Sequence, residues 1–414
     1  MNGEKEKLVR VQTKDLKVGM FVHDVGRRWI GHPWPRKSKL ITSENDIKQL
    51  RRYGIREVTV DLNRNRRPWT EAVEEIREDG HETIEELPAV ENEPVELFEE
   101  PPELIPIEDE IPRAREVYFT ALETAREFTI AARAGRQVNV AKVRENIEEL
   151  IDSAFRNRDA ALALLKLKFY DEYIFTHSLN VAVLAIGMGF HMNLTRADIL
   201  NLGMGAMLHD LGKTGVPLAI LNKKGRLTDE EYNTIKGHPL IGARLLEKHQ
   251  EVPPQTIDLT RHHHERIDGS GYPDGLSGDE LNSMLTITSL SDVYDALSSD
   301  RIYHKGLLPH EALKTIFALR DKQFNRLWIE RFVQCLGIYP AGTLIQLNSG
   351  EIGVVSSINR SMLLRPVIRP IFDRFGRRAT DKDFLDLQDS KYLDRSIIGV
   401  LDPKELKLDL SSYF

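Results

Sequence analysis

The sequence predicts a multidomain protein, with an all-α domain flanked by a small α/β N-terminal domain and a small β-rich C-terminal appendage. Three observations support this fold class. At 414 residues the chain is too long for one ordinary hydrophobic core. An acidic, proline-rich stretch follows the first 66 residues. The apolar residues recur with a helical period in the middle of the chain, and with strand-like runs near its end.

Residues 1–66 are expected to form the α/β domain. The apolar run Met20–Val22 is typical of a strand, and Ser43–Asp46 is a capping-type helix start. The helix that follows would turn Ile47, Leu50 and Tyr53 inward and end at Gly54. A second strand is indicated over Ile55–Asp61.

Residues 67–112 are expected to be an extended acidic linker. Within it, 71–112 holds 17 acidic residues, one basic residue and six prolines. Like-charge repulsion and missing amide donors oppose a packed core there. A partner-binding acidic tail is the functional alternative. Outside this stretch the chain is mildly basic, which suits an anionic substrate but is also common in proteins that bind nothing negative.

The all-α domain is expected over 113–340. An amphipathic pattern of period 3.6 is clear at 143–151, and Gly337 and Pro340 mark the end of the helices. Further helices are expected over Ala160–Leu167, His177–Met192, Arg196–Leu208, Asp229–His249, Leu285–Ser298 and His310–Leu319.

The β-rich appendage is expected over 341–414. Thr343–Leu347 and Ile352–Ile358 flank Asn348-Ser349-Gly350, a good hairpin signal, and Ile397–Leu401 is a further candidate strand.

The composition indicates a cytoplasmic protein. The start, Met1–Gln12, is polar and charged and predicts no secretory signal. The longest apolar window, Val181–Phe190, is far shorter than the ~20 residues of a membrane span. The single cysteine, Cys335, permits no internal disulfide and fits a reducing compartment.

The most informative feature is a series of histidines and aspartates in the all-α domain. Imidazole and carboxylate together suit Fe, Mn or Zn, and a carboxylate among histidines can bridge two ions. A glycine-rich loop with one aromatic ring, Asp268–Pro273, lies between the last histidines and the last aspartate. The sequence therefore predicts a dinuclear metal hydrolase. The seven candidate ligands are His177, His209, Asp210, His238, His263, His264 and Asp292.

A structural role has to be weighed against metal binding for each histidine. Lone histidines on apolar helices, such as His191, His249 and His310, are more often core residues. The pair His209-Asp210 differs, because an unpaired aspartate at the end of an apolar helix is costly unless a cation accompanies it. The adjacent His263-His264 would repel each other unless metal binding held them neutral.

These motifs resemble a known enzyme family. His209-Asp210 with the other ligands resembles the HD superfamily of metal-dependent phosphohydrolases, and 263–273 looks like the signature of its HD-GYP branch. The match spans about 160–340. Residues 10–66, with Gly31–Trp34 and Thr42–Asp46, are similar to an N-terminal domain of unknown function that often precedes HD-GYP domains. The resemblance implies an HD-type helical catalytic domain that hydrolyses cyclic di-GMP to pGpG, sometimes onward to GMP, and so lowers a bacterial second messenger.

The resemblance also implies a role for each ligand. Asp210 would bridge two divalent ions, Fe or Mn by preference. His177, His209 and Asp292 would complete one metal site, and His238, His263 and His264 the other. His262 falls outside the motif. Some family members carry a carboxylate one turn before the first ligand and bind a third ion. Here Tyr173 stands at that position and Glu172 points elsewhere around the helix, so we expect two ions.

Other residues would act on the substrate. Lys213 stands where the family places a phosphate-facing lysine, which can neutralise a phosphate oxygen or protonate the leaving oxygen. Tyr272 would stack on guanine or bind phosphate, and Gly271 would allow close backbone approach. Arg301 and Lys305 lie in a segment that resembles the family's basic segment after the last aspartate. The alternatives without a role in function are that Lys213 is a solvent-exposed lysine, that Tyr272 only fills a turn, and that Arg301 is a solvent-exposed loop residue.

Two alternative functions stay open. The protein could be a catalytically weak receptor that contacts diguanylate cyclases through the loop around Tyr272, although a pure scaffold has no physical need for seven ligands. It could also be a phosphohydrolase that acts on another cyclic dinucleotide. No DNA or RNA polymer is expected as a partner.

Overall fold

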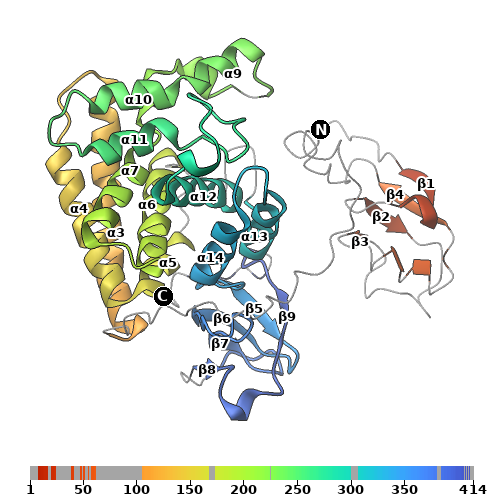
Figure 1. The fold of residues 1–414 in the computed structure, drawn as a ribbon. Helices are drawn as coiled ribbons and strands as arrows, with labels where there is room; N and C mark the ends of the chain where they lie inside the picture. The colour runs from red at the N-terminus through yellow and green to blue at the C-terminus, as the bar shows by residue number, and fades with distance from the viewer. Residues whose placement is uncertain are drawn as a thin grey trace, which may run out of the picture. The chain divides into compact units, whose positions relative to one another are not determined.

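Figure 1 shows the computed structural model of the chain, which divides into two compact units, Met1–Glu91 and Asn92–Phe414. In the second unit it describes residues 105–166, 173–223, 225–299, 306–379, 384–404, 406, 408 and 410. In the first unit it describes residues 8–16, 20–24, 39–41, 47–48, 50–51, 55 and 57–61.

The first unit contains a small antiparallel sheet with strand order β1-β4-β2-β3. The expected strands are present as β2 and β4, and Ile47 and Leu50 are helical and buried as predicted. Tyr53, the Ser43–Asp46 cap and the Gly31–Trp34 motif lie outside the described residues. The strands are β1 (Leu8–Gln12), β2 (Phe21–Asp24), β3 (Lys39–Leu40) and β4 (Glu57–Asp61).

The second unit is built on one large helical core. Helix α6, which is apolar on most sides, lies at its centre, and α7, α12, α3 and α4 pack around it. The helices are α3 (Ile107–Arg133), α4 (Val140–Arg156), α5 (Arg158–Ala163), α6 (Tyr173–His191), α7 (Arg196–Leu208), α8 (Leu218–Leu221), α9 (Asp229–Lys236), α10 (His238–Leu246), α11 (Pro254–His262), α12 (Ser283–Ser298), α13 (Pro309–Ala318) and α14 (Arg326–Leu336).

Helix α3 begins at Ile107, so the linker boundary expected at 112 lies too late in the chain. The acidic residues at 108–110 do not oppose packing, because they stand in the first turn of a helix, where negative charge is favourable. Glu110 is fully buried and accepts two hydrogen bonds of 2.7 Å from Arg156 and one of 2.6 Å from Ser153. This pairing ties the end of the acidic stretch to α4.

The helix expected over Asp229–His249 is two helices, α9 and α10. Helix α9 starts with a capping box at Thr228 and ends at Lys236, and Gly237 separates it from His238. Pro239 stands in the first turn of α10, where its missing amide hydrogen costs nothing. The break places His238 at a helix start instead of inside a helix.

The C-terminal part is β-rich, as predicted. It forms an antiparallel sheet of order β8-β7-β6-β5-β9, in which the predicted hairpin pairs Leu344 with Val354. The strands are β5 (Leu344–Leu347), β6 (Ile352–Ser357), β7 (Val367–Phe372), β8 (Leu385–Asp386) and β9 (Ile397–Val400). Buried Asp159 on α5 accepts hydrogen bonds from Ile358 N at 2.9 Å and Arg360 at 2.7 Å, which fastens the sheet to the helices. Among the described helices, none is both long and apolar enough to cross a membrane.

Candidate metal centre

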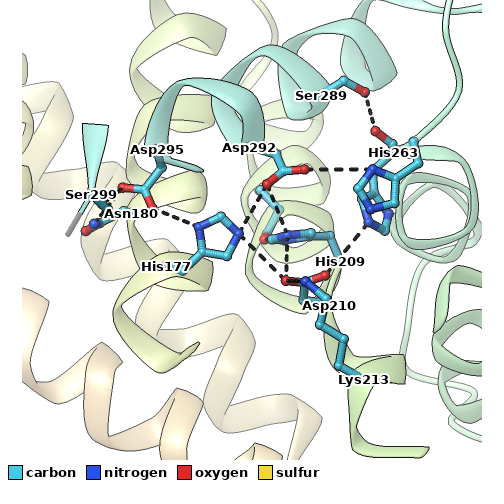
Figure 2. Close-up of polar contacts among 12 residues, drawn as sticks. His177, Asn180, His209, Asp210, Lys213, His263, Ser289, Asp292, Asp295 and Ser299 are labelled. Carbon is cyan, nitrogen blue, oxygen red and sulfur yellow. Dashed lines mark hydrogen bonds and ion pairs between the residues drawn. The ribbon is translucent and has the colours of Figure 1, made fainter. Parts of the chain in front are cut away.

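The structure brings the seven expected ligands into one cluster, although they come from five separate places in the chain. Helices α6 and α12 contribute from their interiors, and the other residues stand at helix ends or helix starts (Figure 2). His177 lies on α6, His209 and Asp210 follow α7, His238 begins α10, His263 and His264 follow α11, and Asp292 lies on α12.

The cluster consists of two groups with Asp210 between them. In the first ligand group, His177, His209 and Asp292 offer ligand atoms within 4.8 Å of one another, and in the second group His238, His263 and His264 do the same. Asp210 Oδ2 lies 3.7 Å from His177 Nε2, and Asp210 Oδ1 lies 3.2 Å from His238 Nε2. The carboxylate therefore faces both groups.

Three of the histidines are fixed in one tautomer by the backbone. The Nδ1 atoms of His209, His238 and His263 each donate to the carbonyl oxygen three residues earlier, at 2.6, 2.8 and 2.9 Å. A carbonyl oxygen only accepts, so each Nδ1 carries the hydrogen and each neutral ring presents a lone pair at Nε2. These lone pairs point into the cluster.

This arrangement fits a cation. The Nε2 atoms of His238 and His263 face each other at 3.1 Å, so two lone pairs meet. Among the described residues, His209 Nε2 and Asp210 Oδ1 are buried without a hydrogen-bond donor. Unpartnered acceptors are costly in a buried site, and a metal ion that receives their lone pairs removes that cost. The donor set of imidazoles and carboxylates suits Fe, Mn or Zn.

The electrostatics keep the ligands in metal-binding protonation states. Burial and the neighbouring rings lower the pKa of His263 well below its ordinary value and that of His264 to about 3. Burial would raise the pKa of Asp210, but the Lys213 ammonium and His209 outweigh it and hold this pKa well below the usual range. His177 differs. Burial would lower its pKa, yet hydrogen bonds to Asp292 and Asp295 raise it to about 9.

Lys213 lies at the edge of the cluster. Its Nζ atom donates to Asp210 Oδ2 at 2.6 Å, and about a third of its side chain is exposed. Gly212 beside it packs against α10 so closely that a Cβ atom would meet His238 O at 1.8 Å. Only glycine therefore allows the segment that carries Asp210 and Lys213 to approach His238.

The Gly-Tyr-Pro loop is folded onto the second ligand group. The Tyr272 ring lies against the His264 ring, with centroids 4.8 Å apart. Lys236, which sequence reasoning missed, places its ammonium 5.3 Å from the centroid of the Tyr272 ring. At Gly271 a Cβ atom would meet the Glu265 backbone at 2.4 Å, so this glycine is needed for the loop's own packing. Its expected approach to substrate stays a prediction.

Glu265 holds the backbone of this loop through its side chain. Its buried carboxylate accepts backbone hydrogen bonds from Asp274, Gly275 and Leu276 at 2.7, 3.0 and 3.1 Å. The sequence contained a signal for this role, because the glutamate directly follows His263-His264 in a charged motif. His262 has both ring nitrogens paired with carboxylates, those of Asp258 and Asp274, and so does not face the cluster.

Asp295 supports a ligand and is not positioned as one itself. Its Oδ2 atom accepts from His177 Nδ1 at 2.8 Å, while Oδ1 accepts from Asn180 and Ser299 (Figure 2). Its sequence signal is a carboxylate one turn beyond Asp292 in an otherwise uncharged helix. Arg301, Lys305 and Glu172 and the side chain of Tyr173 lie outside the described residues, so the roles expected for them stay predictions.

Comparison with known proteins agrees with this arrangement. Residues 8–143 match a domain of unknown function, residues 145–326 an HD domain, and residues 344–409 a KOW domain associated with HD domains. The chain is 33% identical to the cyclic di-GMP phosphodiesterase PA4108 of Pseudomonas aeruginosa, over 95% of this chain and 92% of that protein.

Two further relatives match about a third of the chain. The cyclic di-GMP phosphodiesterase response regulator RpfG of Xanthomonas campestris is 40% identical over 32% of this chain and 36% of its own length. A 3'3'-cGAMP-specific phosphodiesterase of Vibrio cholerae is 37% identical over 34% of this chain and 30% of its own length. Because the match to PA4108 covers nearly the full length of both chains and the ligand cluster is present, the chain belongs to the HD-GYP family of HD-domain cyclic di-GMP phosphodiesterases.

Proposed function

We propose that this protein hydrolyses cyclic di-GMP to linear pGpG at the cluster around Asp210, with two divalent ions held by the seven ligands. The observation that carries the proposal is the convergence of buried lone pairs on a carboxylate that faces both ligand groups. Fe and Mn are the ions that we favour, because mixed imidazole and carboxylate ligands suit them.

When bound, two divalent ions supply Lewis-acid activation of the phosphate. They also lower the pKa of water, so that hydroxide is available as the nucleophile at neutral pH. The protein's own residues would do the remainder. The Lys213 ammonium is partly exposed, which lets it turn from Asp210 toward a phosphate oxygen or the leaving oxygen. The Tyr272 ring, with Lys236 beside it, offers an aromatic face and a cation at the edge of the ligand cluster.

The substrate could also be a different cyclic dinucleotide, since one relative is specific for 3'3'-cGAMP. A direct test incubates the full-length protein, loaded with Mn²⁺ or Fe²⁺, with cyclic di-GMP and with 3'3'-cGAMP at equal concentration, and resolves the products by chromatography. We expect pGpG as the main product, with slower release of GMP. Preferred cleavage of 3'3'-cGAMP would replace our substrate assignment, and no cleavage of either would refute the proposed function.

We also propose a cellular compartment and a class of partner protein. The single buried cysteine fits a reducing cytoplasm, where cyclic dinucleotides are signals. Diguanylate cyclases are proposed as partners through the Gly-Tyr-Pro loop. The test is whether a diguanylate cyclase co-purifies with the wild-type protein and fails to co-purify with the Tyr272→Ala variant.

A further inference from the structure

A buried chain of hydrogen bonds connects helix α3 with a metal ligand. Tyr118 Oη on α3 donates to Asn180 Oδ1 at 2.7 Å, and Asn180 Nδ2 donates to Asp295 Oδ1 at 2.8 Å. His177 Nδ1 then donates to Asp295 Oδ2 at 2.8 Å. All four residues are at most 5% exposed. Figure 2 shows the part of this chain from Asn180 to His177.

This support distinguishes His177 from three of the other histidines. His209, His238 and His263 donate from Nδ1 to the backbone carbonyl three residues earlier in the chain, which side-chain substitutions do not remove. His177 depends instead on the carboxylate of Asp295, and thus on whatever holds that carboxylate. Outer partners of this kind set the orientation and basicity of a ligating imidazole.

The direction of each bond is determined by the carboxylate of Asp295, which can only accept. Asn180 therefore turns its amide nitrogen toward Asp295 and its amide oxygen toward Tyr118, and the Tyr118 hydroxyl donates to that oxygen. Without that hydroxyl the amide oxygen would be buried with no donor, and the side chain would have to shift to satisfy it. A shift of Asn180 removes a hydrogen bond that holds Asp295, and the His177 ring, which donates to Asp295, then loses its fixed orientation.

We propose that Tyr118 is a positioning residue, which holds the metal ligand His177 in place from helix α3 through the side chains between them. The inference rests on the proposed function for its biological meaning. It concerns metal binding, however, and is tested without any nucleotide. Helix α3 begins at the end of the acidic stretch, so the first ligand group is connected to a helix that precedes the residues matched to the HD domain.

The test titrates Mn²⁺ into full-length protein stripped of metal by a chelator and follows free Mn²⁺ by electron paramagnetic resonance. Replacing a direct outer partner usually weakens metal binding ~10–100-fold, and we expect this of Asp295→Asn. Tyr118 lies two hydrogen bonds further from the ligand than Asp295, and for Tyr118→Phe we expect about a 10-fold loss of Mn²⁺ affinity in one of two binding phases. The second phase, from the group with His238, should not change.

The matched control is Thr124→Val, which also removes a buried hydrogen bond between α3 and an asparagine of a neighbouring helix, Asn146. This bond does not lead to a ligand, so both binding phases should stay as in the wild type although the fold loses stability. Activity of Tyr118→Phe should recover at saturating Mn²⁺. Wild-type binding by Tyr118→Phe, or an equal loss in Thr124→Val, would overturn the proposal. Failure of cyclic di-GMP hydrolysis would refute the proposed function and leave this result intact.

Discussion

Glu265 should be the residue on which the Gly-Tyr-Pro loop most depends. Its carboxylate accepts three backbone hydrogen bonds, two at Oε1 and one at Oε2. Hydrogen bonds to a charged group contribute ~1.5–3 kcal/mol each. Glu265→Gln keeps one oxygen for two of these donors, but it removes the charge and turns an amide N–H₂ toward the third donor. We therefore expect the loop to lose about 3 kcal/mol of local stability.

Hydrogen exchange of the backbone amides at 274–276 measures this loss directly. A change of about 3 kcal/mol corresponds to exchange roughly 100-fold faster, since each factor of ten requires ~1.4 kcal/mol. The KM for cyclic di-GMP should rise as well, because the same loop carries Tyr272.

Glu280→Gln is the matched control. This glutamate also caps a turn of the loop, with Ser277 N donating to its Oε2 at 3.0 Å, but it is exposed. We expect its replacement to change local stability by less than ~1 kcal/mol. If Glu265→Gln exchanged no faster than Glu280→Gln, the loop would not depend on the buried carboxylate and our interpretation of it would be refuted.

Three further predictions concern the cluster itself. Asp210→Ala should abolish hydrolysis and lower the metal content from two ions per chain, as elemental analysis can show, and wild-type turnover with two ions bound would contradict its bridging role. Lys213→Ala should retain both ions and slow kcat by ~10²-fold. Loss of metal in that variant would instead indicate that the lysine mainly holds Asp210. Because the pKa of His177 is raised to about 9 without metal, Mn²⁺ must displace its proton at pH 7. The apparent affinity should thus rise about tenfold per pH unit from 7 to 9 and level off above, and calorimetry in two buffers that detected no proton release would refute this.

Much of the site could be predicted from residue type and spacing. The spacing of histidines and aspartates along one stretch, taken together with the resemblance to the HD-GYP branch, predicted the seven candidate ligands, and the structure brings all seven together. The hairpin Leu344–Ser357 followed from local turn chemistry. The start of α3 did not, because burial of Glu110 against Arg156 outweighs the repulsion that the local sequence implies.

Which side chains can bind metal and where several of the helices lie could be read from the sequence, because both depend on residue identity and on periodicity along the chain. How those ligands are supported depends on the tertiary structure. Tyr118 and Asp295 are separated by more than 170 positions in the sequence, and they are joined through Asn180 only because α3 and α12 both pack against α6. Likewise, the three amides held by Glu265 could not be anticipated, since the path of a loop over a buried carboxylate follows from packing and not from local propensity.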